Sequence, residues 1–392
     1  MKSSLLAIPA IIVTLVGCSR EVAPSSIKEA WNYRNRPQIF NVTEFQFDSL
    51  PVEGIIDDSK YPWSDDYWPT YGGGISKRWQ ITPPSTNYRD YQYPWLTRAQ
   101  ILNGTSPVSV EHLSPAEKYD LLRGRYDFPL AKRERALQEA AVDPSTGQIP
   151  YWYGLCHGWA PAAALEPEPG AVATMVNPDG LQIPFYTSDI NALFTKIYAD
   201  NLGSSVAVGE RCYTENHEIE VDENNRIVVS NCRDTNPGAL HVILAHYLGK
   251  ADPLRRTTFI ADVTRGSEVW NQPIVGFKIA EAVRTRFNSR QDPLARFRAP
   301  GTVELVKVTT EISYVGEIMP HRSPAIEHRN QYTMKQWLQY TLELNRAGEI
   351  IGGEWNGSSA PDFLWRMLAK PQTSGYLDYD TVVQIAEQSR VQ

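Results

Sequence analysis

Cysteine is scarce in this 392-residue sequence: there are four, and none lies in a Cys-x-x-Cys pair. This excludes a small disulfide scaffold and a zinc ribbon, which both need closely spaced cysteines. An excess of basic residues is also missing, since 38 Lys and Arg face 45 Asp and Glu. With a net charge of −7, no basic surface for a phosphate backbone is expected, so we expect no nucleic-acid partner. Internal repeats and low-complexity tracts are lacking as well.

Long apolar runs are missing except at the N-terminus, where Leu5 to Val16 follows a single lysine. This pattern predicts a secretory signal peptide over residues 1–17, too short to span a bilayer as a mature anchor. Leu15-Val16-Gly17-Cys18 is similar to the bacterial lipobox, so we expect cleavage before Cys18 and lipidation of that cysteine. Serine rather than aspartate follows, which favours an outer membrane lipoprotein facing the periplasm or the cell surface. The alternative is an ordinary signal peptide with an incidental cysteine.

The composition, 42% hydrophobic and 11% aromatic, is typical of an ordered globular chain with two or three domains. Helix signals come first, at residues 98–103, 115–122, 133–141 and from 188 onward. Extended runs follow at 240–248, 257–263, 303–314, 340–344 and 349–351. Helices before strands favour an α+β fold with an antiparallel sheet. We divide the chain into a signal peptide (1–17), an N-terminal extension (18–125), a catalytic core (126–300) and a β-rich C-terminal part (301–392).

The N-terminal extension is rich in Pro, Tyr, Trp, Asp and Ser and has little regular periodicity. Its aromatic residues, as in the stretch 65–74, favour a packed wrapping segment over a carbohydrate-binding patch. Because many enzymes that use a reactive cysteine are made latent, residues before about 125 are also a candidate pro-segment over the cleft.

An exported chain passes through an oxidising compartment, which favours disulfide formation. Cys212 and Cys232 bracket residues 218–229, whose alternation around a polar turn predicts a β-hairpin, so we expect a bridge across its base. Cys156 is then left without a partner. The turn residues 222–225 are acidic but lack EF-hand spacing, so a solvated turn is favoured over a calcium site.

The unpaired cysteine lies in the stretch Gly154-Leu155-Cys156-His157-Gly158-Trp159, followed by small residues. This pattern is typical of a loop that delivers a cysteine to the start of a buried helix. A thiol there is exposed to the positive end of the helix dipole, and a histidine partner can lower its pKa to about 3–4. Papain-like hydrolases and transglutaminases have this construction, with histidine and Asp or Asn on later strands.

His241 and Asp262 are the candidate partners of Cys156. His241 begins the extended run 240–248 after an Asn-Pro-Gly turn, so as a strand residue it would stand at the sheet edge over the thiol. His246 would then point to the opposite face. An antiparallel neighbouring strand, 257–262, would place Asp262 beside the imidazole. We therefore predict a Cys156–His241–Asp262 triad, although such a trio is a weak signal in a chain of this length.

A longer motif strengthens this hypothesis. Val269-Trp270-Asn271-Gln272-Pro273-Ile274-Val275-Gly276-Phe277-Lys278-Ile279-Ala280-Glu281 closely resembles the elicitor peptide of the oomycete transglutaminase elicitor family. The cysteine motif 156–160 and the segments 342–345, 352–355 and 361–365 also resemble that family, over roughly residues 100 to 370. The sequence differs at Val275, where the elicitor peptide has a basic residue, and at Ala280, where it has an aromatic one. Recognition by a plant immune receptor is therefore not implied.

The resemblance implies protein-glutamine γ-glutamyltransferase activity, frequently with calcium as activator and with no organic cofactor. Cys156 would attack a glutamine carboxamide, and a lysine amine would resolve the thioester into an isopeptide bond, with His241 moving the protons. The Cys156 backbone N–H, with Trp152 or Trp270, would hold the oxyanion; the alternative role of each tryptophan is plain core packing.

The motifs add three further residues to the expected substrate cleft: Trp159, Asn271 and Gln272. The expected partners are proteins that bear Gln and Lys, and the membrane through the lipid anchor. The alternatives are a papain-like cysteine protease, a protein-glutamine deamidase, and a non-enzymatic surface interaction protein that displays the Trp270 segment.

Overall fold

A computed structural model describes residues 28–391, except for 80–84, 225, 250–255 and 372–374. The expected signal peptide and Cys18 therefore lie outside the described residues. The helices are α1 (Arg98–Leu102), α2 (Pro115–Leu122), α3 (Pro129–Ala140), α4 (Cys156–Leu165), α5 (Thr187–Asp200), α6 (Pro237–Leu248) and α7 (Tyr379–Val391). Across the described part of the chain, no helix is long and apolar enough to cross a bilayer.

The strands form one large antiparallel sheet and a separate hairpin. Their bounds are β1 (Glu53–Ile55), β2 (Val172–Val176), β3 (Gln182–Tyr186), β4 (Ser205–Gly209), β5 (Phe259–Asp262), β6 (Asn271–Arg286), β7 (Glu304–Val315), β8 (Thr333–Leu344), β9 (Ile350–Trp355) and β10 (Phe363–Met367). The sheet order is β4-β10-β5-β6-β7-β8-β9, with β1 beside β6 and with β2 paired to β3 outside the sheet. The expected α+β class with an antiparallel sheet is confirmed, and the sheet is continuous across residue 300.

Strand β6 organises the sheet because it has two partners along one edge. β5 pairs with its first residues, from Asn271 to Ile274, and β1 pairs with the following ones, from Gly276 to Lys278. Register shifts near Ile274 and Ile279 bend the strand as it passes from one partner to the next. The start of β6 is thereby fixed against β5, at the level where α4 packs on it.

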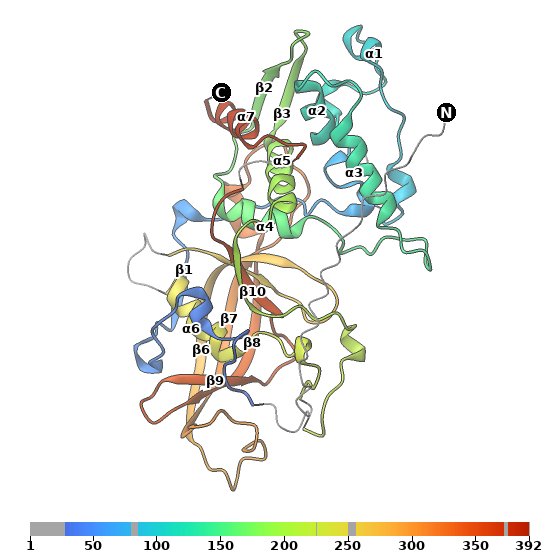
Figure 1. The fold of residues 1–392 in the computed structure, drawn as a ribbon. Helices are drawn as coiled ribbons and strands as arrows, with labels where there is room; N and C mark the ends of the chain where they lie inside the picture. Colours follow the sequence, from blue (N-terminus) through green and yellow to red (C-terminus); the bar gives the residue numbers. More distant parts are fainter. Residues whose placement is uncertain (1–27, 80–84, 225, 250–255, 372–374, 392) are drawn as a thin grey trace, which may run out of the picture.

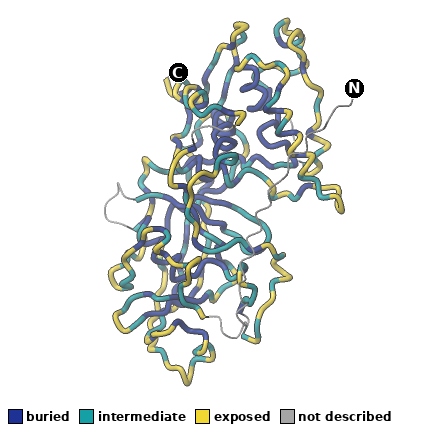
Figure 2. The backbone as a smooth tube through the Cα atoms, in the orientation of Figure 1, coloured by how far each residue is buried: buried dark blue, intermediate teal, exposed yellow. Residues whose placement is uncertain are grey.

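One helix, α6, lies against the sheet, and the other helices lie at and beyond one end of it (Figure 1). α6 packs against β1, β6, β8 and β9, whereas α4 contacts the start of β6 and also α5. α1, α2, α3, α5 and α7 gather with the β2–β3 hairpin at the end of the molecule opposite β9. Buried backbone runs through both parts and through the region between them (Figure 2), and one hydrophobic cluster includes residues of each. α4 therefore sits where the helical part meets the sheet.

Two expected strand regions have a different structure. Residues 240–248, expected to be a strand, belong to helix α6, in which the Asn236 side chain accepts the N–H of Gly238 and Pro237 occupies the first turn. These are strong helix-start signals, and they outweigh the β-branched content of the run. The expected hairpin at 218–229 is present only in reduced form: in place of two paired strands, one antiparallel bridge joins Val221 to Ile227. The Asp222 N–H donates to the Arg226 carbonyl oxygen and the Val228 N–H to the Glu220 carbonyl oxygen.

Within the N-terminal extension (18–125), the described residues up to 97 are irregular as expected, with short 3₁₀ turns and the brief strand β1, whereas α1 and α2 occupy its last part. Trp63 and Trp68 are 1% and 2% exposed, so this segment is packed into the core and does not form an aromatic surface patch. At its start, Ala30 bridges Gly352 on the edge strand β9, and the Glu29 carboxylate pairs with Arg226 and Arg233. An edge strand that is covered in this way is protected from pairing with other chains.

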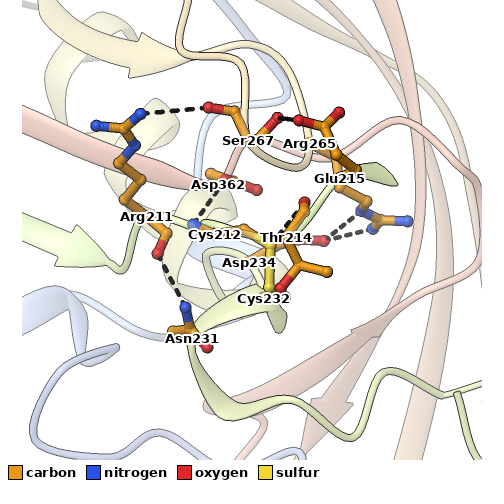
Figure 3. The surroundings of a disulfide bond; sticks show 10 residues. All are labelled: Arg211, Cys212, Thr214, Glu215, Asn231, Cys232, Asp234, Arg265, Ser267 and Asp362. Carbon is orange, nitrogen blue, oxygen red and sulfur yellow. Dashed lines mark hydrogen bonds and ion pairs between the residues drawn. A yellow bond between two sulfur atoms is a disulfide. The ribbon is translucent and has the colours of Figure 1, made fainter. Parts of the chain in front are cut away.

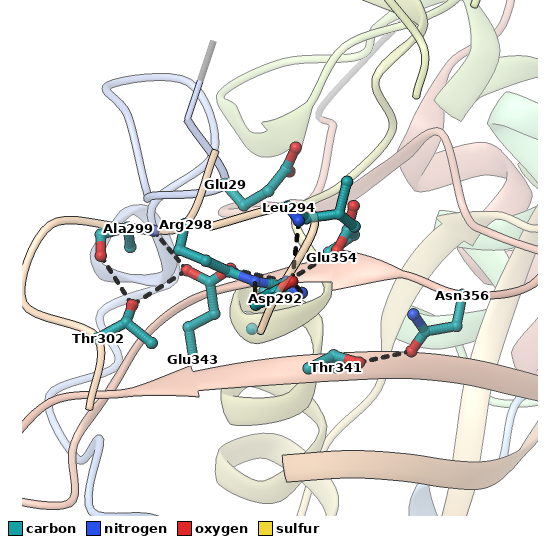
Figure 4. Close-up of polar contacts among 12 residues, drawn as sticks. Glu29, Asp292, Leu294, Arg298, Ala299, Thr302, Thr341, Glu343, Glu354 and Asn356 are labelled. Atoms are coloured by element: carbon teal, nitrogen blue, oxygen red, sulfur yellow. Dashed lines mark hydrogen bonds and ion pairs between the residues drawn. The ribbon is translucent and has the colours of Figure 1, made fainter. Parts of the chain in front are cut away.

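A buried ion-pair network lies beside this docking point (Figure 4). The Arg298 guanidinium contacts carboxylates of Asp292 at 2.8 Å, Glu354 at 2.8 Å and Glu343 at 3.2 Å. The Glu343 carboxylate also accepts the backbone N–H of Ala299. Because each carboxylate is satisfied by a specific donor, the network fixes the chain after β6 against β8 and β9.

Candidate active site

Cys156 is the first residue of α4, and its thiol is buried with 4% of the residue exposed. Two close contacts fix this position. The Leu155 N–H donates to the carbonyl oxygen of Tyr67 at 2.6 Å, and Gly154 lies so near Tyr67 that a Cβ there would approach it to 2.5 Å. The backbone N–H groups of Cys156 and His157 form no hydrogen bond with any described residue. These two donors at the helix N-terminus are available to a developing negative charge.

The thiol faces the start of β6. The Asn271 Nδ2 donates to the Cys156 Sγ at 3.5 Å, and the Sγ lies 3.6 Å from the carbonyl oxygen of Val269. The Trp365 Nε1–H donates to the Asn271 Oδ1 at 2.7 Å, which orients the amide with its NH₂ group toward sulfur. Burial raises the pKa of the thiol to about 11, while the donors of Asn271 lower it. The resting thiol is therefore protonated, and its proton must leave before sulfur can attack a carbonyl.

A cavity of about 520 Å³ opens over the thiol. Its walls are mainly apolar and aromatic, and the residues that line it are Thr70, Trp152, Tyr153, Gly154, Cys156, His157, Leu202, Ser205, Ala207, Arg211, Val269, Asn271, Phe363 and Trp365. Burial lowers the pKa of His157, so that imidazole is neutral at pH 7. Among these lining residues, Arg211 is the one that carries a formal charge. The volume is sufficient for a side chain such as glutamine with part of its backbone.

His241 is placed away from the predicted triad. It lies on helix α6, its Nδ1 hydrogen-bonds the Tyr340 hydroxyl at 2.9 Å, and its ring stacks on Phe47. Burial lowers its pKa to about 4. Among the described residues, no hydrogen bond or ion pair joins His241 to Cys156 or Asp262. The strand register that placed His241 over the thiol and beside Asp262 is therefore wrong, because the segment is helical.

Asp262, in contrast, lies close to the thiol. It pairs with Asn271 across the β5–β6 ladder, and its charge acts to raise the pKa of Cys156. Its Oδ1 accepts the backbone N–H of Trp270 at 2.9 Å and the Thr264 hydroxyl at 2.8 Å, whereas its buried Oδ2 has no hydrogen-bond partner among the described residues. Burial raises the pKa of Asp262 to about 6. This carboxyl group can therefore change protonation state near neutral pH.

The other expected cleft residues divide into two groups. Trp152 and Asn271 line the cavity. Trp159 is fully buried in the core, and the Trp270 indole N–H is directed to Glu268 at 3.3 Å. The Gln272 amide faces away from the cavity lining and donates to Glu317 at 2.8 Å.

Three functional candidates were not identified from the sequence: Arg211, Trp365 and Glu317. Trp365 belongs to a segment that resembles the elicitor family, but no local pattern links it to Asn271. Arg211 lies beside a half-cystine, which gives no indication of a cavity position. Burial raises the pKa of Glu317 to about 7, and its charge also acts on Cys156.

The expected disulfide between Cys212 and Cys232 is present and closes the chain segment behind the cavity (Figure 3). The backbone N–H of Cys212 donates to Asp362 at 3.0 Å, and Arg265 pairs with Asp234. Burial and the neighbouring Asp234 raise the pKa of Asp362 to about 9, so this carboxyl keeps its proton at pH 7. The bridge, the Asp234–Asp362 carboxyl pair and Arg265 together hold the residues that follow β4.

Comparison with known proteins places this geometry in a family. The model of the transglutaminase elicitor family matches residues 38–390. The chain belongs to the transglutaminase elicitor family. Its structure is similar to the crystal structure of the GP42 transglutaminase from Phytophthora sojae, with a TM-score of 0.62 and 25% sequence identity, over 89% of this chain and 94% of that chain. A comparison with curated protein sequences returned no match.

The structure shows where residues 269–281, the segment that resembles the elicitor peptide of this family, lie. Its first residues, Val269 and Asn271, contact the thiol, and the segment then runs along β6. Residues 271–277 are buried, whereas exposure begins at Lys278. Val269 and Asn271, at the start of the segment, are therefore part of the wall around Cys156.

Proposed function

We propose that this chain is a protein-glutamine γ-glutamyltransferase in which Cys156 is the nucleophile. The observation that carries the proposal is the free thiol at the N-terminus of α4, directed into a cavity and contacted by the Asn271 amide. A binding module would have no need of a buried thiol with this set of donors. The family relationship and the similarity to a transglutaminase structure support the same reaction class.

The mechanism follows from the atoms around the sulfur. The Cys156 Sγ attacks the carboxamide carbon of the glutamine as the thiol proton leaves. The resulting oxyanion accepts hydrogen bonds from the free backbone N–H groups of Cys156 and His157. Ammonia departs with a proton and leaves a thioester. A lysine amine then attacks this thioester, loses a proton, and releases the thiol with an isopeptide bond. If water attacks instead of the amine, the product is glutamate.

We assign the proton-accepting role to Asp262. Its Oδ2 has no hydrogen-bond partner among the described residues, its pKa of about 6 suits proton exchange at neutral pH, and its cross-strand neighbour Asn271 contacts the sulfur. Proton transfer from the sulfur to this carboxyl would run directly or through one bridging water. Asp262→Asn should lower kcat by about 10²–10⁴-fold with little change in fold. Glu317→Gln is the matched variant, because it removes the other carboxyl that acts on the thiol.

The decisive experiment measures incorporation of a fluorescent primary amine into a glutamine-bearing protein, together with ammonia release, by purified wild type and Cys156→Ala. Amine incorporation that depends on Cys156 supports the proposal. Ammonia release without incorporation would establish a deamidase, and peptide-bond cleavage would establish a protease. If no chemistry distinguishes wild type from Cys156→Ala, the chain is an interaction protein.

The described residues hold no group of three or more His, Cys, Asp or Glu side chains placed to bind a metal such as calcium. In the acidic turn, the Asp222 carboxylate accepts the backbone N–H groups of Asn224 and Arg226, as a solvated turn does. No step of the mechanism is therefore derived through calcium. Amine incorporation with added calcium and with a chelator tests whether the reaction requires it.

We further propose that the mature chain is anchored in the outer membrane through a lipid on Cys18, and that its partners are proteins bearing Gln and Lys. Metabolic labelling with a palmitate analogue should label the wild type and not Cys18→Ala. Equal labelling of both chains would contradict the anchor.

A further inference from the structure

Arg211 stands apart from the other residues of the cavity because it brings a positive charge into a largely apolar wall. It lies two residues after the end of β4, and its guanidinium lies over the rings of Trp152, at 5.6 Å, and Tyr213, at 5.0 Å. A charge beside aromatic and aliphatic surface is poorly screened by water, so its interactions with a ligand are stronger than at an open surface.

The position of Arg211 is fixed by contacts on both its backbone and its side chain (Figure 3). The Asn231 Nδ2 donates to the Arg211 carbonyl oxygen at 3.4 Å, and the next residue, Cys212, is held by the disulfide. On the side chain, the Nη2 donates to the carbonyl oxygen of Ser267 at 3.3 Å. Ser267 belongs to the turn that also brings Val269 to the thiol.

Most donors of this guanidinium have no acceptor within the described chain. The Nη2–Ser267 contact is its one hydrogen bond there, no carboxylate pairs with it, and its Nε is buried without a partner. A buried donor that lacks an acceptor is costly, and a planar guanidinium fits a carboxylate through two parallel hydrogen bonds. Asp262 is near enough to be influenced by the charge, and its Oδ1 accepts from the Thr264 hydroxyl and the Trp270 N–H, but among the described residues no hydrogen bond or ion pair joins its carboxylate to Arg211.

We propose that Arg211 binds a carboxylate of the acyl donor, so that the preferred glutamine substrates are acidic close to the reactive glutamine. This inference rests on the proposed function, because it describes the substrate of the same cavity. The carboxylate belongs either to an Asp or Glu side chain that flanks the glutamine or to a chain terminus. In both cases the carboxylate provides the hydrogen-bond acceptor that Arg211 lacks, while the aromatic walls of the cavity enclose the glutamine.

The test uses acetylated and amidated pentapeptides with a central Gln and Ala elsewhere, in which Glu is placed in turn at each flanking position. A further peptide has no Glu but keeps a free C-terminal carboxylate. We expect at least one of these acidic peptides to exceed the all-Ala peptide by about 10- to 100-fold in kcat/KM for amine incorporation, as expected for a charge-assisted hydrogen bond. The peptide that gives this preference identifies the source of the carboxylate.

Variants separate the charge from the fold. Arg211→Gln should reduce the preference to about 1, and Arg211→Lys should retain part of it, because lysine keeps the charge but not the two parallel donors. The matched control is Arg290→Gln, which removes an exposed arginine from the loop after β6 and should keep the full preference. Thermal unfolding and near-ultraviolet circular dichroism of each variant establish that it is folded.

A binding measurement keeps this inference distinct from the proposed reaction. Peptide binding to the Cys156→Ala chain, followed by tryptophan fluorescence, should show the same preference and the same loss in Cys156→Ala/Arg211→Gln. Preferential binding without any amine incorporation in the active chain would overturn the proposed function and support the carboxylate site. Equal binding of acidic and all-Ala peptides, or a preference that survives Arg211→Gln, would overturn the inference.

Discussion

Gly158→Ala is expected to separate activity from stability, because Gly158 is the point where α4 touches α5. A Cβ on this glycine would lie 2.2 Å from the Thr195 carbonyl oxygen and 2.6 Å from the Ala199 Cβ. Both groups belong to α5, which is fixed by its buried surface and cannot yield as the end of a flexible side chain would. To restore a separation of about 3 Å, the helices must move apart by roughly 0.8 Å.

Two opposing energies set the expected stability change. Alanine is favoured over glycine inside a helix by about 1 kcal/mol, while overpacking of this kind costs about 1–3 kcal/mol. The net loss should therefore be no more than about 2 kcal/mol. Activity should suffer far more, because Cys156 lies two residues away on the same helix and moves with it relative to Asn271. A misplacement of about 1 Å in a reacting group can reduce the rate on the order of 10²-fold.

The measurements are amine incorporation, the rate of Cys156 alkylation by iodoacetamide, and urea unfolding. Gly357→Ala is the control, because an added Cβ at that half-buried glycine meets nothing closer than 3.7 Å. We expect Gly158→Ala to lose most of its activity while unfolding near the wild-type midpoint, and Gly357→Ala to match the wild type in all three. If Gly158→Ala retains wild-type activity and alkylation, the close packing of α4 on α5 does not position the thiol.

Three further predictions concern buried groups. His241→Gln should lower the free energy of unfolding by about 1–3 kcal/mol, because the hydrogen bond between His241 and the Tyr340 hydroxyl is lost. Its amine incorporation per folded molecule should stay within a few-fold of the wild-type value. A variant that is inactive but as stable as the wild type would restore His241 as a catalytic base. The pKa of Asp362 is raised to about 9 in the folded protein. Protonation of this carboxyl therefore stabilises the fold fully at a pH below the pKa of an unfolded aspartate, and this stabilisation is lost as the pH rises toward 9. In Asp362→Asn, the Tm measured by scanning calorimetry should therefore decline less between pH 6 and 9.5, and a decline as steep as that of the wild type would refute this. Replacing Cys212 and Cys232 together by Ala should cost about 3 kcal/mol in urea unfolding, the value for a loop of this length, and a change below 1 kcal/mol would contradict it.

Elements with strong local signals were predictable from the sequence. The Ser114–Glu117 capping box with Pro115 predicts a helix, and α2 begins there with both reciprocal bonds formed. Helix α6 was not predicted because nearly every residue from 237 to 248 is buried, so the segment has no polar face and no helical period. Strand β6 was missed for a related reason: its first half is buried on both faces and its second half is exposed on both, so alternation never appears.

The candidate site was predictable only where a single motif contains the information. The motif around Cys156 predicts a thiol at a helix start, and the structure places it there. The contact between Asn271 and Trp365 joins residues 94 positions apart, so no local pattern predicts it. His241 was chosen on the assumption that residues 240–248 form a strand, whereas they belong to a helix. The disulfide was predicted correctly although the hairpin expected between its cysteines is reduced to one antiparallel bridge, because few cysteines leave few pairings.

The attachment of the N-terminal segment to β9 determines how the protein responds to mechanical load. The Glu29 N–H donates to the carbonyl oxygen of Phe297, the Gly353 N–H donates to the carbonyl oxygen of Glu29, and the Glu29 carboxylate pairs with Arg226 and Arg233. A pull exerted through residues that precede Glu29 is therefore resisted first by these bonds. They lie at the β9 edge of the sheet, whereas β4, which lines the cavity, forms the other edge. A load applied at the N-terminus therefore meets this attachment first, at the sheet edge remote from the cavity.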